Sequence, residues 1–226
     1  MNKFTLSATN FVYNFTFYNQ EFENILKEII ACYYCIVSEN KKLPSNNENT
    51  IRDIILKDYL KNRTFKEAHF PLDKYLFDKE ISEDEGRVDI RIMNIKPFTD
   101  DYTYYIIECK RLNNENTIGE TGLNAKYIYE GIARFTSNKY SMYKNTAGMI
   151  GFVVEKMDIR KNISNIRTLL KQNFNDINTE QNLKYKKIAS GFDYSYFSKH
   201  KINGVSKIIY HLMFDFSDNI THENLL

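Results

Sequence analysis

Apolar residues in the first third of the chain repeat at helical spacing. In residues 20–38 (QEFENILKEIIACYYCIVS), positions three and four apart are apolar, which predicts a helix with a broad buried face. The apolar positions are Phe22, Ile25, Leu26, Ile29, Ile30 and Tyr33. The segment KKLPSNN then interrupts the pattern with Pro and Asn, which indicates a break between elements.

A second apolar stripe predicts a helix over residues 47–62. Its members are Ile51, Ile54, Ile55 and Tyr59, and Asn46 or Asn47 is suited to cap its start. Glu48 precedes Ile51 by three residues and Ile55 by seven, so it lies on the inward edge of the stripe. That is an unusual place for a solvated carboxylate.

The middle of the chain carries the predicted strands. We expect a short strand near 65–70 and a charged loop over 73–85, which contains the acidic run 83–85. Residues 86–92 (GRVDIRI) alternate apolar and polar, with Asp89 on the polar side. Residues 102–110 (YTYYIIECK) are rich in Tyr and Ile and predict a central strand, on which Glu108 and Lys110 share one face.

The remaining pattern continues the alternation of helices and strands. We predict a polar loop over 111–122, a helix over 123–136, a strand over 147–155 and a helix over 160–172. The segment 184–216 predicts a pair of strands around the turn HKING. This order indicates one α/β domain spanning 1–226, with helices flanking a mixed sheet of five or six strands.

Composition narrows the class of protein without naming a function. The 226 residues are 42% hydrophobic and 27% charged, as in soluble globular proteins, and the net charge of +2 neither requires nor excludes nucleic acid. Three cysteines argue against a disulfide framework, and Cys32 and Cys35 are expected to be thiols on a helix. With no secretory signal and no apolar run of about 20 residues, we expect a cytoplasmic protein without membrane contact.

Asp89 in GRVDI and Glu108-Cys109-Lys110 in IIECK follow one another on consecutive predicted strands. Together with the preceding helix and the following helix and strand, this arrangement over residues 46–156 resembles the PD-(D/E)XK nuclease superfamily. The resemblance implies a restriction-endonuclease-like αβββαβ core, to which the N-terminal helix and the C-terminal strands are additions. It also implies hydrolysis of phosphodiester bonds.

The resemblance assigns a role to each residue of the motif. Asp89, Glu108 and the backbone carbonyl of Cys109 would hold Mg²⁺, or Mn²⁺ in its place, since hard oxygen ligands suit these ions. Lys110 would position the attacking water and stabilise negative charge. Glu48 resembles the acid that many members carry on the preceding helix to complete the metal site.

Further residues are weaker candidates. Lys126, Tyr127 and Arg134, on the predicted helix 123–136, are candidate nucleic-acid contacts, although Tyr127 fits the core equally well. His211, in an apolar strand, is expected to be a hydrogen-bonded core residue, whereas His200 is expected at a turn, within reach of a phosphate. His222 belongs to no recognisable metal-binding pattern.

The resemblance favours a bacterial restriction or defence endonuclease that acts on DNA, and it implies a homodimer. Alternatives remain open: the acidic residues and Lys110 form a cross-strand ion-pair network, or Glu48 only stabilises a helix dipole. Another alternative is a non-catalytic module that keeps the fold to bind nucleic acid or assemble with partners. A last one is a subunit of a defence complex that docks through the aromatic segment 192–197 (FDYSYF).

Overall fold

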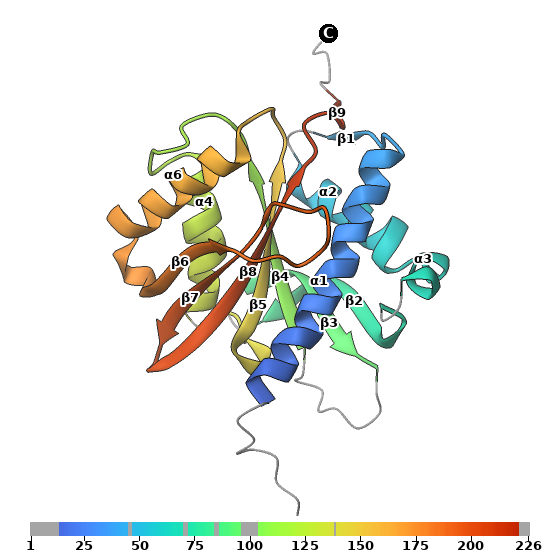
Figure 1. Ribbon diagram of the computed structural model, residues 1–226, viewed down its shortest axis with the longest axis horizontal. Helices are drawn as coiled ribbons and strands as arrows, with labels where there is room; N and C mark the ends of the chain where they lie inside the picture. The colour runs from blue at the N-terminus through green and yellow to red at the C-terminus, as the bar shows by residue number, and fades with distance from the viewer. Residues whose placement is uncertain are drawn as a thin grey trace, which may run out of the picture.

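A computed structural model describes residues 14–44, 47–69, 72–83, 86–95, 104–137 and 139–221, and its centre is one seven-stranded sheet (Figure 1). The strands, in the order in which they lie side by side, are β2 (Tyr75–Glu83), β3 (Gly86–Asn94), β4 (Tyr104–Leu112), β5 (Thr146–Val153), β8 (Val205–Asp215), β7 (Ser195–Ile202) and β6 (Thr179–Tyr185). The strands β4, β5 and β8 run parallel, and the neighbouring pairs on both sides are antiparallel. The prediction of a mixed sheet is confirmed, with seven strands instead of five or six.

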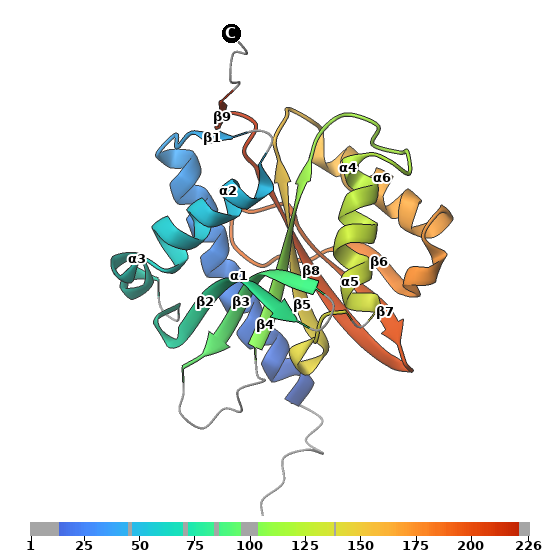
Figure 2. The same cartoon turned by 180° about the vertical axis from the view of Figure 1, so that it is seen from behind.

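Helices cover both faces of the sheet (Figures 1 and 2). On one side lie α1 (Asn14–Ser38), α2 (Glu48–Ile54) with the π-helix η1 (Ile55–Leu60), and α3 (Arg63–Ala68). On the other lie α4 (Leu123–Lys126), the π-helix η3 (Tyr127–Ile132), α5 (Ala133–Thr136) and α6 (Ile159–Gln172). Each layer buries its own apolar cluster against the sheet, so the central strands are apolar on both faces.

Short elements complete the chain. β1 (Leu43–Pro44) pairs in parallel with β9 (Ile220–Thr221), which ties the C-terminal segment to the connection between α1 and α2. Single 3-10 turns lie at η2 (Leu72–Lys74), η4 (Tyr143–Asn145) and η5 (Asn175–Ile177). No helix in the described part of the chain has the length and apolar character needed to cross a bilayer.

Two predictions before Asp89 are wrong. Of the predicted strand 65–70, the described residues 65–69 do not form a strand: Asn62 accepts a hydrogen bond from the Phe65 backbone and caps α3, a short helix. Residues 73–85 are not a loop, because β2 occupies most of that range. Tyr75 and Phe77 point into the core while Leu76 between them is exposed, so the charges further along β2 had hidden a strand pattern.

The C-terminal prediction is also incomplete. The segment 184–198 does not continue as one strand, because a bend between β6 and β7 divides it and makes three strands of the predicted pair. Gly191 lies in this bend with φ of 78°, a conformation that glycine adopts without strain. Phe192 and Tyr196 are buried at 2% and 5% exposure, so these two rings of segment 192–197 are not available for docking, whereas Tyr194 and Phe197 are partly exposed.

Candidate functional site

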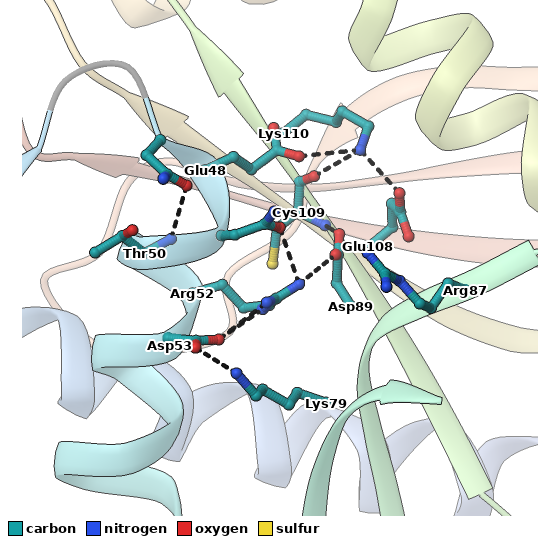
Figure 3. Close-up of polar contacts among 12 residues, drawn as sticks. Glu48, Thr50, Arg52, Asp53, Lys79, Arg87, Asp89, Glu108, Cys109 and Lys110 are labelled. Carbon is teal, nitrogen blue, oxygen red and sulfur yellow. Dashed lines mark hydrogen bonds and ion pairs between the residues drawn. The ribbon is translucent and has the colours of Figure 1, made fainter. Parts of the chain in front are cut away.

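The four predicted catalytic side chains lie together beside β4 (Figure 3), and residues of α2 and α4 line the cleft next to them. Asn47 caps α2 by accepting a hydrogen bond from the Thr50 backbone, which fixes Glu48 in the first turn of the helix. On the sheet, Ile90 pairs with Ile107, so Asp89 and Glu108 are neighbours across β3 and β4. The chain thus brings one acid from a helix next to two acids and a lysine from adjacent strands.

Lys110 is the centre of this cluster. Its Nζ donates to Glu108 Oε1 at 2.8 Å, to the Cys109 carbonyl at 2.9 Å and to Glu48 Oε1 at 3.3 Å. Burial, which leaves Lys110 7% exposed, acts to lower its pKa, but the negative charges of Glu108 and Glu48 outweigh burial and raise it. The ammonium group therefore stays charged and gathers three oxygens around one point.

Asp89 points to a different cation. Its Oδ1 accepts a hydrogen bond from Arg52 Nη1 at 2.9 Å, and its Oδ2 accepts one from the Cys109 backbone N–H at 2.8 Å. Arg52 is only 1% exposed and also donates to Asn49 and Asp53. Sequence reasoning missed Arg52, although it follows Glu48 by four residues and therefore shares its face of the helix.

Glu108 is buried completely and is only partly neutralised. Its Oε1 accepts from Lys110 and, at 2.8 Å, from Arg134 Nη1, while its Oε2 has no hydrogen-bond partner among the described residues. Burial, and then the charge of Asp89, raise its pKa to about 7 against the opposing effects of Lys110 and Arg134. An unpartnered buried carboxylate oxygen is costly, and it marks a place where a proton or a cation would be stabilised.

This pKa makes the stability of the protein depend on pH. The folded state holds the Glu108 proton up to about pH 7, whereas the unfolded chain releases it near 4.5, so the free energy of unfolding falls as pH rises through that interval. As pH rises from about 5 to about 8, the free energy of unfolding of Glu108→Gln, measured relative to that of the parent, should increase by about 2 to 3 kcal/mol. Urea unfolding at both pH values measures this, and the exposed control Glu67→Gln should show no such gain. An effect of Glu108→Gln that is equal at both pH values contradicts the assignment.

Arg134 belongs to the site itself. Its Nη1 contacts both Glu108 and the Tyr140 hydroxyl, which in turn donates to the Arg87 carbonyl at 2.6 Å. The Arg134 side chain is 34% exposed, so it lies between the buried carboxylate and solvent. The prediction had treated Arg134 only as a peripheral nucleic-acid contact.

The two other candidate nucleic-acid contacts, Lys126 and Tyr127, lie in different places: Lys126 faces the site and Tyr127 lies in the core. Lys126 is exposed and lines a cleft of about 270 Å³ together with Glu48, Lys110 and Glu130, so it faces the site from α4. Tyr127 is fully buried, and its hydroxyl shares a 2.8 Å hydrogen bond with His211 Nδ1. The prediction that Tyr127 contacts nucleic acid is wrong, because it belongs to the core.

The histidines in the described part of the chain do not contribute to the site. His211 is a fully buried, hydrogen-bonded core residue, as predicted, and burial lowers its pKa to about 3. His200 lies inside β7, also fully buried, so its predicted place at a turn near a phosphate is wrong. His222 lies outside the described residues.

Cys32 is a buried free thiol on α1, and Cys35 is a half-buried one.

The oxygens around Lys110 suit a divalent cation in kind. In the described ranges, no three His, Cys, Asp or Glu side chains form a ready metal-binding group. The Glu48 and Glu108 carboxylates and the Cys109 carbonyl nevertheless converge on one cationic atom, and they are the hard oxygen donors that Mg²⁺ and Mn²⁺ prefer. Asp89 does not join this convergence, because Arg52 and the Cys109 N–H hold its oxygens.

Both helices that reach the site contain a π-helical segment. The π-helix η1 follows α2 directly, and η3 separates α4 from α5. Such segments interrupt the regular ladder of hydrogen bonds and are frequent at functional sites.

Comparisons with protein-family models, curated proteins and solved structures find no match to this chain.

Proposed function

We propose that the protein is a metal-dependent nuclease that hydrolyses the phosphodiester bonds of DNA. The observation that carries the proposal is the convergence of Glu48, Glu108 and the Cys109 carbonyl on the Lys110 ammonium, beside Asp89. The element order gives further support. A helix, the strands β2, β3 and β4, a second helix and the parallel strand β5 succeed one another as in the restriction-endonuclease-like core.

The residues divide the chemistry between them. Glu48, Glu108 and the Cys109 carbonyl would hold Mg²⁺ or Mn²⁺, with Asp89 as the additional carboxylate that the resemblance assigns. When bound, such an ion lowers the pKa of water and neutralises phosphate charge. Lys110 orients the attacking water and stabilises the negative charge on the phosphate, while the half-exposed Arg134 and the exposed Lys126 bind phosphate oxygens from the rim.

The biological setting follows from the resemblance alone. A role in bacterial restriction or in defence against mobile elements, in the cytoplasm, is part of the proposal, as is a homodimer that cuts one strand at each site. The overall charge of +2 is compatible with DNA binding, because the partly exposed Arg134 and the exposed Lys126 lie on the solvent side of the site.

Cleavage of supercoiled plasmid, single-stranded DNA and RNA in Mg²⁺, Mn²⁺ or EDTA tests the proposal. We expect one of these substrates to be cut with metal and to stay intact in EDTA. Isothermal titration calorimetry with Mn²⁺ provides an independent reading of metal binding. Absence of both cleavage and metal binding would overturn the proposal.

One observation favours a second candidate, a non-catalytic nucleic-acid-binding or assembly module. Every carboxylate of the site already has a basic partner, Arg52 for Asp89 and Lys110 for Glu48 and Glu108, so the cluster is also an ion-pair network. Such a module would bind DNA equally well in metal and in EDTA. Mn²⁺ binding that is lost in Glu108→Gln distinguishes the nuclease from the module.

Glu48→Gln should reduce cleavage by about 10-fold to 100-fold, which is less than the loss expected for the strand residues. The amide oxygen of Gln can still accept the 2.9 Å hydrogen bond from the Arg111 N–H, but one charge at the metal is lost. Initial rates over a range of Mg²⁺ concentrations measure the effect, which should shrink at high metal. Glu67→Gln, on the exposed surface of α3, is the matched control. Equal rates for both variants would limit Glu48 to a role in the helix.

A further inference from the structure

The helix α6 lies beside β6 and β7 at the edge of the sheet (Figure 1). Residues of these three elements line a pocket of about 510 Å³. Arg160, Ile163 and Arg167 follow one another at spacings of three and four residues, so one face of α6 forms its first wall. Tyr185 and Tyr196 form the second wall, and they are direct partners in the register of β6 with β7. The lining therefore combines two guanidinium groups with two phenol rings.

Arg167 presents unused hydrogen-bond donors to this pocket. Its Nε donates to the Leu183 carbonyl at 2.7 Å, which fixes the orientation of the half-buried guanidinium group. Within the described ranges, no residue accepts a hydrogen bond from its Nη groups, and no carboxylate lies within ion-pair distance of them. A fixed guanidinium with free donors is suited to a bidentate interaction with a phosphate.

The remaining charges leave the pocket positive. Arg160 forms an exposed ion pair with Asp193 at 3.3 Å, with 73% and 64% of the two side chains exposed, and such a pair opens readily. The charges of Arg167 and Arg160 both reach the Tyr196 hydroxyl, where they oppose the burial that raises its pKa. Two arginines and one aspartate give the lining a net charge of +1, which attracts an anion.

The tyrosines supply the other half of a binding site. Tyr185 is 47% exposed and meets Tyr196 edge to face at 6.4 Å, so the ring of Tyr196 supports it from one side. An exposed, supported aromatic ring provides a stacking surface for a nucleobase, worth about 1–3 kcal/mol for each base. The pocket volume also falls in the range of small-ligand sites, which is about 300–1,000 Å³.

We propose that this pocket binds a nucleotide, with its phosphate on Arg167 and Arg160 and its base against Tyr185. The nucleotide is either free or part of a single strand, since both present the same phosphate and base. The sheet order separates β7 from β4 by β5 and β8, so these two strands lie roughly 15 Å apart across the sheet and the pocket is separate from the candidate active site. The inference stands independently of the proposed nuclease activity.

Calorimetry on the full chain in EDTA tests this inference with thymidine 5′-monophosphate as the probe. We expect binding that Arg167→Gln weakens at least about 10-fold, because a charge-assisted interaction is lost, and that Tyr185→Leu weakens about 5-fold or more. Thymidine and inorganic phosphate, each lacking half of the probe, should bind at least about 10-fold more weakly. Arg160→Gln changes an exposed side chain, cannot disturb the core, and should weaken binding several-fold.

Controls and a second probe make the outcome decisive. Arg63→Gln removes an exposed arginine of α3 and should bind the monophosphate like the parent. If hexathymidylate binds more tightly than the monophosphate, with the same dependence on Arg167, the ligand is single-stranded nucleic acid. Equal affinity of the two probes identifies a free nucleotide as the ligand. No binding of either probe at about 5 mM, or affinity that is unchanged in both Arg167→Gln and Arg160→Gln, overturns the inference.

Discussion

Replacing Lys110 with Met is expected to lower metal-dependent cleavage by about 10²-fold to 10³-fold while metal binding is kept or strengthened. Met preserves most of the buried stem but removes the ammonium group that contacts Glu48, Glu108 and the Cys109 carbonyl. Without it, the same oxygens lose their internal cation and are left with more negative charge for a divalent ion. Transition-state stabilisation and metal affinity should therefore change in opposite directions.

Two measurements on the same variant separate these effects. Single-turnover cleavage rates give the catalytic loss, and calorimetry with Mn²⁺ gives the affinity. Lys126→Met is the matched control, because Lys126 lines the same cleft but is exposed and contacts none of the three oxygens. It should lose only a few-fold in rate. If Lys110→Met cleaves like the parent, Lys110 has a purely structural role and the nuclease proposal loses its central residue.

The strand residues of this site are predictable from sequence because their geometry is local. Alternation along a strand places Glu108 and Lys110 on one face whatever the rest of the fold does. The apolar character of YTYYII also predicts a central strand, and the structure confirms it. Glu48 is predictable for a similar reason, since its spacing from Ile51 and Ile55 fixes its position on the helix.

The places of Arg52, Tyr127 and β2 depend on contacts between segments that are distant in the sequence, and the spacing of residues along the chain does not reveal such contacts. Arg52 looks like a solvated charge in sequence, and only the approach of α2 to β3 brings Asp89 to it and makes its burial possible. The sequence fits Tyr127 to the core and to a nucleic-acid contact equally well, and the hydrogen-bond partner that decides between them, His211, lies 84 residues away on β8. The strand β2 was missed because its charges have partners on neighbouring elements, such as Arg91 for Asp78 and Asp53 for Lys79.

Arg52 also sets the largest expected effect on stability. Replacing it with Met should lower the free energy of unfolding by about 3–5 kcal/mol, since the change leaves the charge of Asp89 buried without its cation. Asp53, the other acidic partner of Arg52, keeps Lys57 and Lys79, so the loss arises mainly at Asp89. Urea unfolding measures it, and Arg63→Met, at an exposed ion pair of α3, should change stability by less than about 1 kcal/mol.

A double-mutant cycle assigns that loss to the pair. Asp89→Asn removes the buried charge but keeps an oxygen that can accept the 2.8 Å hydrogen bond from the Cys109 N–H. In the Asp89→Asn background, Arg52→Met should therefore cost about 1–3 kcal/mol less than it does in the parent chain. If Arg52→Met costs the same in both backgrounds, Arg52 does not stabilise Asp89. The carboxylate would then be free to serve the metal without displacing a cation, and Arg52 would matter only for packing α2 onto the sheet.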